Sequence, residues 1–119
     1  MHPVKATDEQ FRLVVQAATD VFGSNPNKDY LFIVHNVSDG QGGLEHKNSC
    51  VLSVSRWSYA GSNYTGFINL VAHEYFHLWN VKRIRPIELG PFNYDQECYT
   101  SLLWVMEGIT SYYDELLLK

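Results

Sequence analysis

The sequence predicts an α+β domain in which helices pack against a small sheet. Apolar residues recur at helical spacing near the start of the chain and again after Gly66, and two β-branched segments lie between these regions. The resulting order, α-β-β-α-α, is typical of this class because helices and strands are segregated along the chain. A length of 119 residues suits a single domain, 1–119.

The first predicted helix begins at Thr7 and ends before Gly23. Thr7 can cap the helix, and Gln10 three residues later completes a capping-box pattern. Gly23 is typical of the residue that follows a helix C-terminus. The apolar positions that repeat with helical spacing between these limits are Phe11, Val14, Val15, Ala18 and Phe22.

Two strands are expected next, separated by a glycine-rich loop. Residues 24–29 form a turn cluster, and the apolar, β-branched segment Tyr30–Val37 that follows predicts a strand. The loop covers residues 38–43 and leads through Leu44-Glu45-His46 to a second β-type segment, Ser49–Ser55.

The second and third helices are predicted in the C-terminal half. One spans Phe67 to about Val81, and Arg85-Pro86 prevents it from continuing because the residue before a proline avoids the helical conformation. A loop containing Gly90-Pro91 then leads to the last helix, roughly Gln96–Leu118.

Composition excludes several classes of partner. With 9 basic and 13 acidic side chains the net charge is −4, so the chain has no excess of basic residues for nucleic acid or an anionic membrane surface. No apolar run approaches the roughly 20 residues of a membrane-spanning helix. Cys50 and Cys98 are expected to be ordinary thiols without a disulfide framework. The N-terminus, Met1–Lys5, lacks a signal-peptide pattern, which favours a cytoplasmic location.

A metal-site motif lies within the second predicted helix, where His73-Glu74-Tyr75-Phe76-His77 forms an HExxH pattern. Positions i and i+4 are about 40° apart around a helix and one turn along it, so both imidazoles can reach one ion. Glu74 is about 100° from His73, outside the ligand set but able to hold a water on the metal. The alternative is a surface helix with two unrelated histidines. The apolar flanks predict a buried helix, which favours the metal site.

A catalytic zinc site needs a third protein ligand. Glu107 is a candidate because it is a lone charge in the apolar run Leu103–Ile109, where an unpaired carboxylate is costly unless it meets a cation. A salt bridge to Arg83 or Arg85 is the alternative. Asp114, seven residues later on nearly the same face, either accepts a hydrogen bond from a ligand histidine or is a solvated acid. The downstream acids considered are Glu88, Asp95, Glu97, Glu107, Asp114 and Glu115.

Three segments resemble the glycyl aminopeptidase family, zinc peptidases related to thermolysin and aminopeptidase N. They are Gly42–His46 (GGLEH), His73–Pro86 (HEYFHLWNVKRIRP) and Leu103–Tyr113 (LWVMEGITSYY). The run that continues past the HExxH motif is far more specific than that motif alone. The resemblance implies a zincin-like, thermolysin-like catalytic core with the HExxH motif on one helix and the glutamate ligand on the C-terminal helix.

The same resemblance implies roles for individual residues. Zn²⁺ would be bound by His73, His77 and Glu107, with Glu74 as the general base. Asp114 matches the place of an acid that supports a ligand in related aminopeptidases.

By the same resemblance, Gly42–His46 is an edge segment that lies along the substrate backbone. Gly42 and Gly43 would let a peptide approach the main chain closely, because glycine has no side chain to obstruct it. Glu45 would bind the free α-amine of the substrate. The alternative is a hairpin loop in which Glu45 is exposed to solvent.

The function implied is that of a zinc-dependent aminopeptidase, which hydrolyses peptide substrates at the N-terminus through a zinc-activated water, with small residues such as Gly or Ala preferred. A zinc-stabilised binding domain without turnover and an endopeptidase of the same clan are the alternatives. Members of the family also carry an N-terminal β domain, a C-terminal helical subdomain and often a PDZ module. The chain is therefore expected to be an excised part of a larger catalytic domain, weak or inactive alone.

Overall fold

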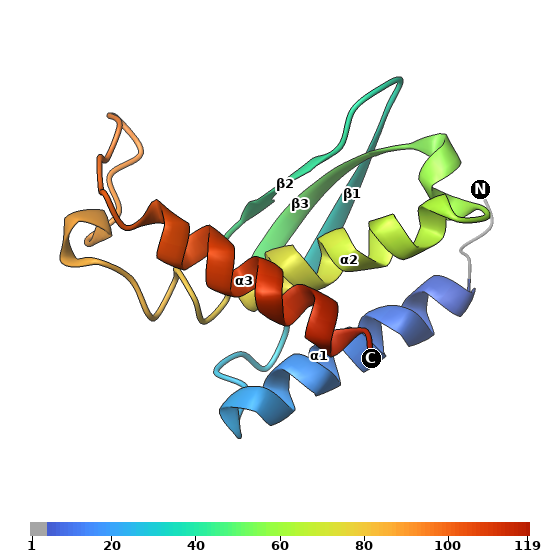
Figure 1. The fold of residues 1–119 in the computed structure, drawn as a ribbon, viewed down its shortest axis with the longest axis horizontal. Coiled ribbons are helices and arrows are strands. Elements are labelled where there is room, and N and C mark those ends of the chain that lie inside the picture. The colour runs from blue at the N-terminus through green and yellow to red at the C-terminus, as the bar shows by residue number, and fades with distance from the viewer. Residues whose placement is uncertain (1–4) are drawn as a thin grey trace.

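The computed structural model describes residues 5–119, which form a small sheet with helices on one side (Figure 1). The helices are α1 (Lys5–Phe22), α2 (Asn63–Phe76) and α3 (Leu103–Leu117). The strands are β1 (Leu31–Val37), β2 (Gly42–Glu45) and β3 (Ser49–Ser55), and two short 3₁₀ helices cover Arg56–Tyr59 and Ile87–Leu89. Three helices with a small sheet confirm the predicted α+β class.

The sheet is mixed, with strand order β1-β3-β2. β3 pairs in parallel with β1 and antiparallel with β2, so β3 is the central strand and β2 is an edge strand. Successive side chains of a strand point to opposite faces. On β3 the alternate residues Cys50, Leu52 and Val54 are completely buried, and they form the part of the core that the sheet contributes.

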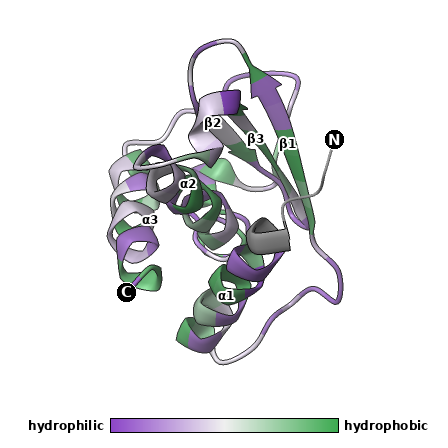
Figure 2. Ribbon diagram, turned by 90° about the vertical axis from the view of Figure 1, so that its right-hand side faces the viewer, coloured by the Kyte–Doolittle hydropathy of each residue, from purple (hydrophilic) through white to green (hydrophobic). Residues whose placement is uncertain are grey.

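The helices gather on one side of the sheet, as a view turned by 90° makes clear (Figure 2). The exposed side chains of the strands include Ile33 of β1 and Leu44 of β2, both of which lie opposite Val51 in the strand register. Within residues 5–119, no helix covers the sheet face on which Ile33 and Leu44 lie. The sheet therefore has one face that is packed and one that is open.

The core is centred on α2, whose apolar residues surround the helix on most sides. Such a helix is stable only when it is buried, since an amphipathic surface helix would keep one polar face. α1 contributes Val14 and Ala18 to the same core, and the Phe22 ring stacks on Trp79 with a centroid distance of 4.6 Å. Burial of each large side chain is worth about 1.5–3 kcal/mol. The HExxH motif thus lies at the end of a helix that most of its side chains anchor in the core.

Two predicted elements near the N-terminus differ from the observed ones. α1 begins at Lys5, so Thr7 lies inside the first turn of the helix and is not its cap. The glycine-rich segment predicted as a loop contributes the strand Gly42–Glu45. Glycine disfavours strands on its own, so tertiary pairing with β3 forms this strand.

The C-terminal helices are shorter than predicted. α2 starts at Asn63, before Phe67, and ends at Phe76, well before Val81, with His77 as its C-cap. It ends because the chain tightens there: the backbone N–H of Trp79 donates to the carbonyl of Phe76 at 3.1 Å.

α3 begins at Leu103, seven residues after the predicted start at Gln96. In the preceding segment, side chains hydrogen-bond the backbone. Asn93 Oδ1 accepts from the N–H of Asp95 at 2.9 Å, and Thr100 Oγ1 accepts from that of Leu102 at 3.2 Å. Bonds of this kind compete with helix formation.

Two further observations concern the described part of the chain. None of its helices is both long and apolar enough to cross a membrane. Cys50 is buried, Cys98 is exposed, and both are free thiols.

Candidate metal centre

Three side chains from two helices converge at one point. His73 lies on α2, His77 caps its C-terminus and Glu107 lies on α3. The two Nε2 atoms are 3.2 Å apart, and Oε2 of Glu107 is 3.1 Å from Nε2 of His73 and 3.6 Å from Nε2 of His77. The cluster is therefore a compact triangle of nitrogen and oxygen atoms.

The dimensions of this triangle fit a tetrahedral ion. Nitrogen and oxygen ligands lie about 2.0–2.2 Å from zinc, so any two of them are separated by about 3.3–3.5 Å. The observed separations are 3.1–3.6 Å. One imidazole pair with one carboxylate is also a donor set that zinc accepts in catalytic sites.

The hydrogen bonds of the two rings determine what their Nε2 atoms present. His77 Nδ1 lies 3.0 Å from the carbonyl of Asn80, which can only accept, so this nitrogen carries the proton. His73 Nδ1 lies 2.7 Å from Oδ2 of Asp114 and donates to the carboxylate. In the neutral rings both Nε2 atoms then carry lone pairs, and together with the Glu107 carboxylate they form three acceptors without a proton between them. A cation bound between these three atoms would accept their lone pairs and remove the repulsion among them.

Glu107 reaches this cluster although its predicted environment is wrong. The apolar run around Glu107 predicts a buried carboxylate, but the Glu107 side chain is 58% exposed because α3 leaves much of its surface uncovered. The alternative partners, Arg83 and Arg85, are engaged elsewhere: Arg83 donates to the carbonyl of Leu78 at 2.8 Å and Arg85 to that of Lys82 at 2.6 Å.

Two residues that the sequence analysis did not single out join the site to α3. Nδ2 of Asn80 donates to the carbonyl of Met106 and to Oγ1 of Thr110, each at 3.1 Å, while the Asn80 carbonyl accepts the hydrogen bond from His77. Both side chains are buried. In the sequence, only their spacing could have pointed to these two residues, since Asn80 follows His77 by three residues and Thr110 follows Glu107 by three.

Glu74 is buried beside the cluster, with only 5% of its surface exposed. Burial raises the pKa of Glu74 to about 7; His73 opposes this rise, and the nearby carboxylates Glu45 and Glu107 add to it. Its Oε2 has no hydrogen-bond partner among residues 5–119. A buried carboxylate with a free oxygen and a pKa near neutrality can accept and release a proton.

Gly43 of the edge strand packs directly against Glu74. A Cβ atom built on Gly43 would collide with the Glu74 carboxylate, whereas a Cβ on Gly42 would meet open space. A side chain at position 43 would have to displace the buried Glu74 carboxylate. Of the two glycines predicted to contact the substrate, Gly43 thus also makes room for the Glu74 side chain.

Glu45 lies at the end of β2, and its side chain is 22% exposed. It pairs with Lys82, whose Nζ is 3.8 Å from Oε1 of Glu45. Ligating atoms of Glu45, Glu74 and His77 also lie within 4.8 Å of one another, so Glu45 reaches the edge of the metal cluster.

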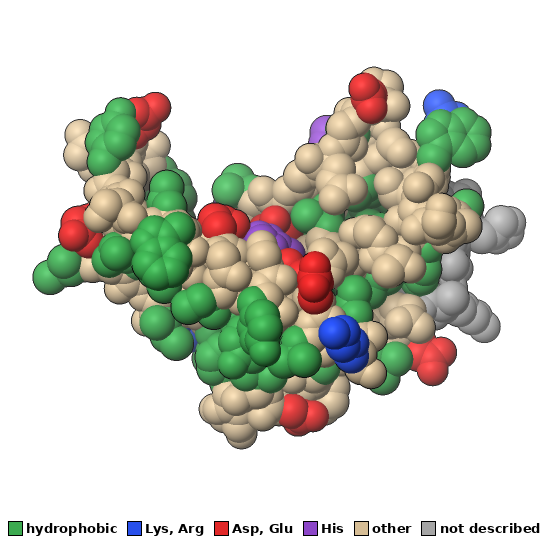
Figure 3. Space-filling view, viewed as in Figure 1, with side chains coloured by type: hydrophobic (Ala, Val, Ile, Leu, Met, Phe, Trp, Pro, Cys, Tyr) green, Lys and Arg blue, Asp and Glu red, His purple; other side chains and the backbone are tan. Residues whose placement is uncertain are grey.

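A cavity of about 330 Å³ opens beside these residues. In the space-filling view a histidine surface flanked by acidic side chains lies in a hollow in the middle of this face, next to apolar side chains of α3 (Figure 3). The lining residues are Gln41, Gly42, Gly43, Asn69, Leu70, His73, Glu74, Ser111 and Asp114.

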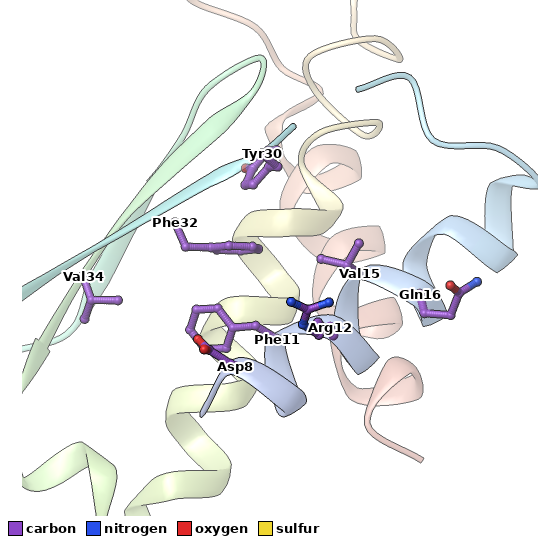
Figure 4. A pocket seen from close by; sticks show the side chains of 8 residues that line it. All are labelled: Asp8, Phe11, Arg12, Val15, Gln16, Tyr30, Phe32 and Val34. Atoms are coloured by element: carbon purple, nitrogen blue, oxygen red, sulfur yellow. The ribbon is translucent and has the colours of Figure 1, made fainter. Parts of the chain in front are cut away.

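A larger cavity, of about 740 Å³, lies elsewhere, between α1 and β1 (Figure 4). Its walls are mostly aromatic and aliphatic, including Phe11, Phe32 and Val34, and its polar residues include Asp8 and Arg12. It contains neither histidine nor the cluster above. The smaller cavity is the candidate site because the ligating atoms of His73, His77 and Glu107 meet beside it.

Comparison with known proteins gives two matches. Residues 66–119 match the family model for M61 glycyl aminopeptidase. The crystal structure of an aminopeptidase N family protein from Idiomarina loihiensis is similar to this chain, with a TM-score of 0.88 and 35% sequence identity. That match covers 99% of this chain and 22% of the other, so the chain spans about a fifth of that protein's length. No curated protein matches the chain.

Proposed function

We propose that this chain, whose residues 66–119 match the family model for M61 glycyl aminopeptidase, is the zincin-like core of a zinc aminopeptidase. The observation that carries the proposal is the convergence of two imidazole Nε2 atoms and one carboxylate oxygen within 3.6 Å, with both Nδ1 atoms already engaged. Such an arrangement of lone pairs is unfavourable without a cation. The fold similarity to an aminopeptidase N family protein supports the same class.

In this proposal His73, His77 and Glu107 hold the zinc ion. When bound, zinc supplies Lewis acidity, which polarises a peptide carbonyl and lowers the pKa of a water molecule. Asp114 and the carbonyl of Asn80 fix the two rings by accepting from their Nδ1–H groups, so that each Nε2 faces the ion.

Glu74 is the general base. Its unpartnered Oε2 accepts a proton from the attacking water, and the protonated carboxyl then donates that proton to the leaving amine. A zinc-stabilised binding domain has no need of such a buried acid.

The edge strand β2 is the proposed substrate platform. One side of β2 pairs with β3, and its other side is a sheet edge to which an extended peptide can add. Gly42 and Gly43 leave this edge without side chains, and Gly43 lies directly against Glu74. Glu45 at the strand end would bind the α-ammonium group of the peptide, which favours cleavage after the first residue, a small one such as Gly or Ala.

The match to 22% of a longer chain supports a further proposal, that these residues are part of a larger catalytic domain. Its other parts would include an N-terminal β domain, a C-terminal helical subdomain and, in some members, a PDZ module. They would complete the cleft and supply the group that stabilises the oxyanion.

The proposal is tested by Glu74→Gln in the complete enzyme. We expect zinc content to remain at one equivalent and the rate on a glycyl amide to fall at least about a hundredfold, the usual scale for loss of a general base. Glu88→Gln, at an exposed acid, is the matched control. Unchanged turnover would overturn the role of Glu74. Equal turnover of the N-acetylated amide would indicate an endopeptidase and overturn the role of Glu45.

A further inference from the structure

Lys82 is a buried cation beside the proposed active site, and the function above does not use it. Its side chain is 6% exposed, and its Nζ lies 3.8 Å from Oε1 of Glu45 and 4.1 Å from the centre of the Phe92 ring. An ammonium group that is buried this deeply requires compensation, which a carboxylate supplies more fully than an aromatic face. Glu45 is thus the main partner of Lys82.

The backbone holds Lys82 in this place. Its N–H donates to the carbonyl of His77 at 3.1 Å, and its own carbonyl accepts from Nη1 of Arg85 at 2.6 Å. The Arg85 guanidinium also lies over Phe92, 4.5 Å from the ring centre. Lys82 is therefore tied to the turn that carries one of the proposed ligands, so its position is fixed relative to the metal.

Glu45 has a second possible partner, the metal itself. One of its carboxylate oxygens lies within 4.8 Å of a ring nitrogen of His77 and of an oxygen of Glu74. A side-chain rotation is enough to move a carboxylate oxygen over such a distance, and carboxylates bind zinc at about 2.0–2.2 Å. Without restraint, Glu45 could join the ion as an additional ligand and crowd the position that a catalytic zinc site keeps open for water and substrate.

We propose that Lys82 is a positioning residue that holds Glu45 away from the metal and so keeps this carboxylate free for the ammonium group of a substrate. This inference rests on the proposed function, because it requires the ion at His73, His77 and Glu107. The ion pair and metal ligation draw on the same carboxylate, so loss of the lysine charge shifts Glu45 toward the ion.

The test uses this chain loaded with Co²⁺, whose visible absorption reports coordination number. Lys82→Met removes the charge and keeps most of the side-chain volume. Lys82→Arg keeps the charge. Lys47→Met removes the charge of an exposed lysine two residues from Glu45 and serves as the matched control.

We expect Lys82→Met to weaken the cobalt absorption, because an additional carboxylate ligand raises the coordination number. Loss of the metal to a chelator should slow by about tenfold, the lower end of the effect that residues outside the ligand set have on metal affinity. Lys82→Arg and Lys47→Met should resemble the wild type. In the double variant Glu45→Gln, Lys82→Met, both changes should disappear, because the competing ligand has been removed.

The outcomes separate the two proposals. A wild-type chain that takes up cobalt with a spectrum that Lys82→Met leaves unchanged overturns this inference and leaves the proposed function standing. A spectral change that persists in the double variant also overturns it, since Glu45 is then not the cause. A wild-type chain that binds no cobalt overturns both. If Lys82→Met does not fold, as judged by circular dichroism, Lys82→Gln replaces it with the same expectations.

Discussion

Oδ2 of Asp114 lies 2.7 Å from Nδ1 of His73, and this contact joins the C-terminal part of α3 to the last turn of α2. Burial raises the pKa of Asp114, and its hydrogen bond and charge interaction with His73 counteract that rise. The contact fixes the ring orientation and directs Nε2 of His73 toward His77 and Glu107.

The first prediction follows from that contact. Asp114→Asn keeps the shape of the side chain but removes its charge, so Nε2 of His73 becomes less basic. We expect zinc affinity to fall by about 10- to 100-fold, as is usual for such partners, measured by competition with a chromophoric chelator. Glu115→Gln, at the exposed neighbouring acid, should leave affinity unchanged. An Asp114→Asn variant of wild-type affinity would contradict the proposed role.

The second prediction concerns the ligand set. His77→Ala removes one corner of the triangle, so stoichiometric zinc binding at neutral pH should be lost in elemental analysis of the dialysed chain. His35→Ala, at an exposed histidine on β1, should retain one equivalent. If the His77→Ala chain also retains one equivalent, the ion binds elsewhere.

The third prediction concerns the close packing of β2 on α2. Gly43→Ala should destabilise the chain by about 1–3 kcal/mol, the usual cost of overpacking, because the added methyl group collides with Glu74. Gly42→Ala is the matched control, since its methyl group points into open space. The measurement is urea-induced unfolding of both variants. Equal stabilities would show that β2 moves away at no cost.

The fourth prediction concerns the pH dependence of stability in the metal-free chain. The pKa of Glu74 is about 7 in the folded chain, against an ordinary value of 4.5. Between these values the folded state binds more protons than the unfolded state, so the free energy of unfolding falls as pH rises from about 4.5 through 7.

Glu74→Gln carries no titrating group, so it should lose this part of the pH dependence and gain stability relative to wild type at pH 8. Urea unfolding at pH 5.5 and pH 8 measures the effect, and Glu88→Gln should follow the wild-type slope. Parallel slopes for wild type and Glu74→Gln would mean that Glu74 ionises freely in the folded chain.

The fifth prediction concerns this chain alone. The chain spans about a fifth of a similar protein, and we propose that the oxyanion donor and the far wall of the cleft belong to other parts of a larger catalytic domain. Loss of one such donor costs about 100- to 1,000-fold in rate. We therefore expect little or no hydrolysis of a glycyl chromogenic amide by the zinc-loaded chain, with its Glu74→Gln variant as the blank. A rate within tenfold of a complete family member would contradict this expectation.

The fold class and the proximity of His73 to His77 could be predicted because local patterns encode them. Helical spacing located α2, and the i, i+4 placement of His73 and His77 follows from helix geometry. The end of α2 could not be predicted in this way, because Asn80 leaves the helix to hydrogen-bond the backbone of Met106, 26 residues away. β2 was missed for a related reason, since its pairing with β3 outweighs the low strand propensity of two glycines.

Glu107 lies beside His73 and His77, as predicted, but its surroundings differ from those that the prediction assumed. An apolar run predicted burial, but α3 leaves several large apolar side chains exposed, among them Trp104 and Ile109. Sequence alone does not say which face of a hydrophobic helix its neighbours cover. Lys82 was not singled out because its significance depends on Glu45, which belongs to a different element.

Consecutive residues of α2 have different neighbours. Glu74 lies against Gly43 of β2, Tyr75 packs edge-on against Tyr30 at 4.8 Å, and Phe76 stacks on Tyr113 of α3 at 4.9 Å. Each residue added to or removed from a helix rotates all later side chains by about 100°. A single insertion or deletion between Asn63 and His73 would therefore exchange all three neighbours at once. The length of this helix therefore cannot change without loss of the core together with the site.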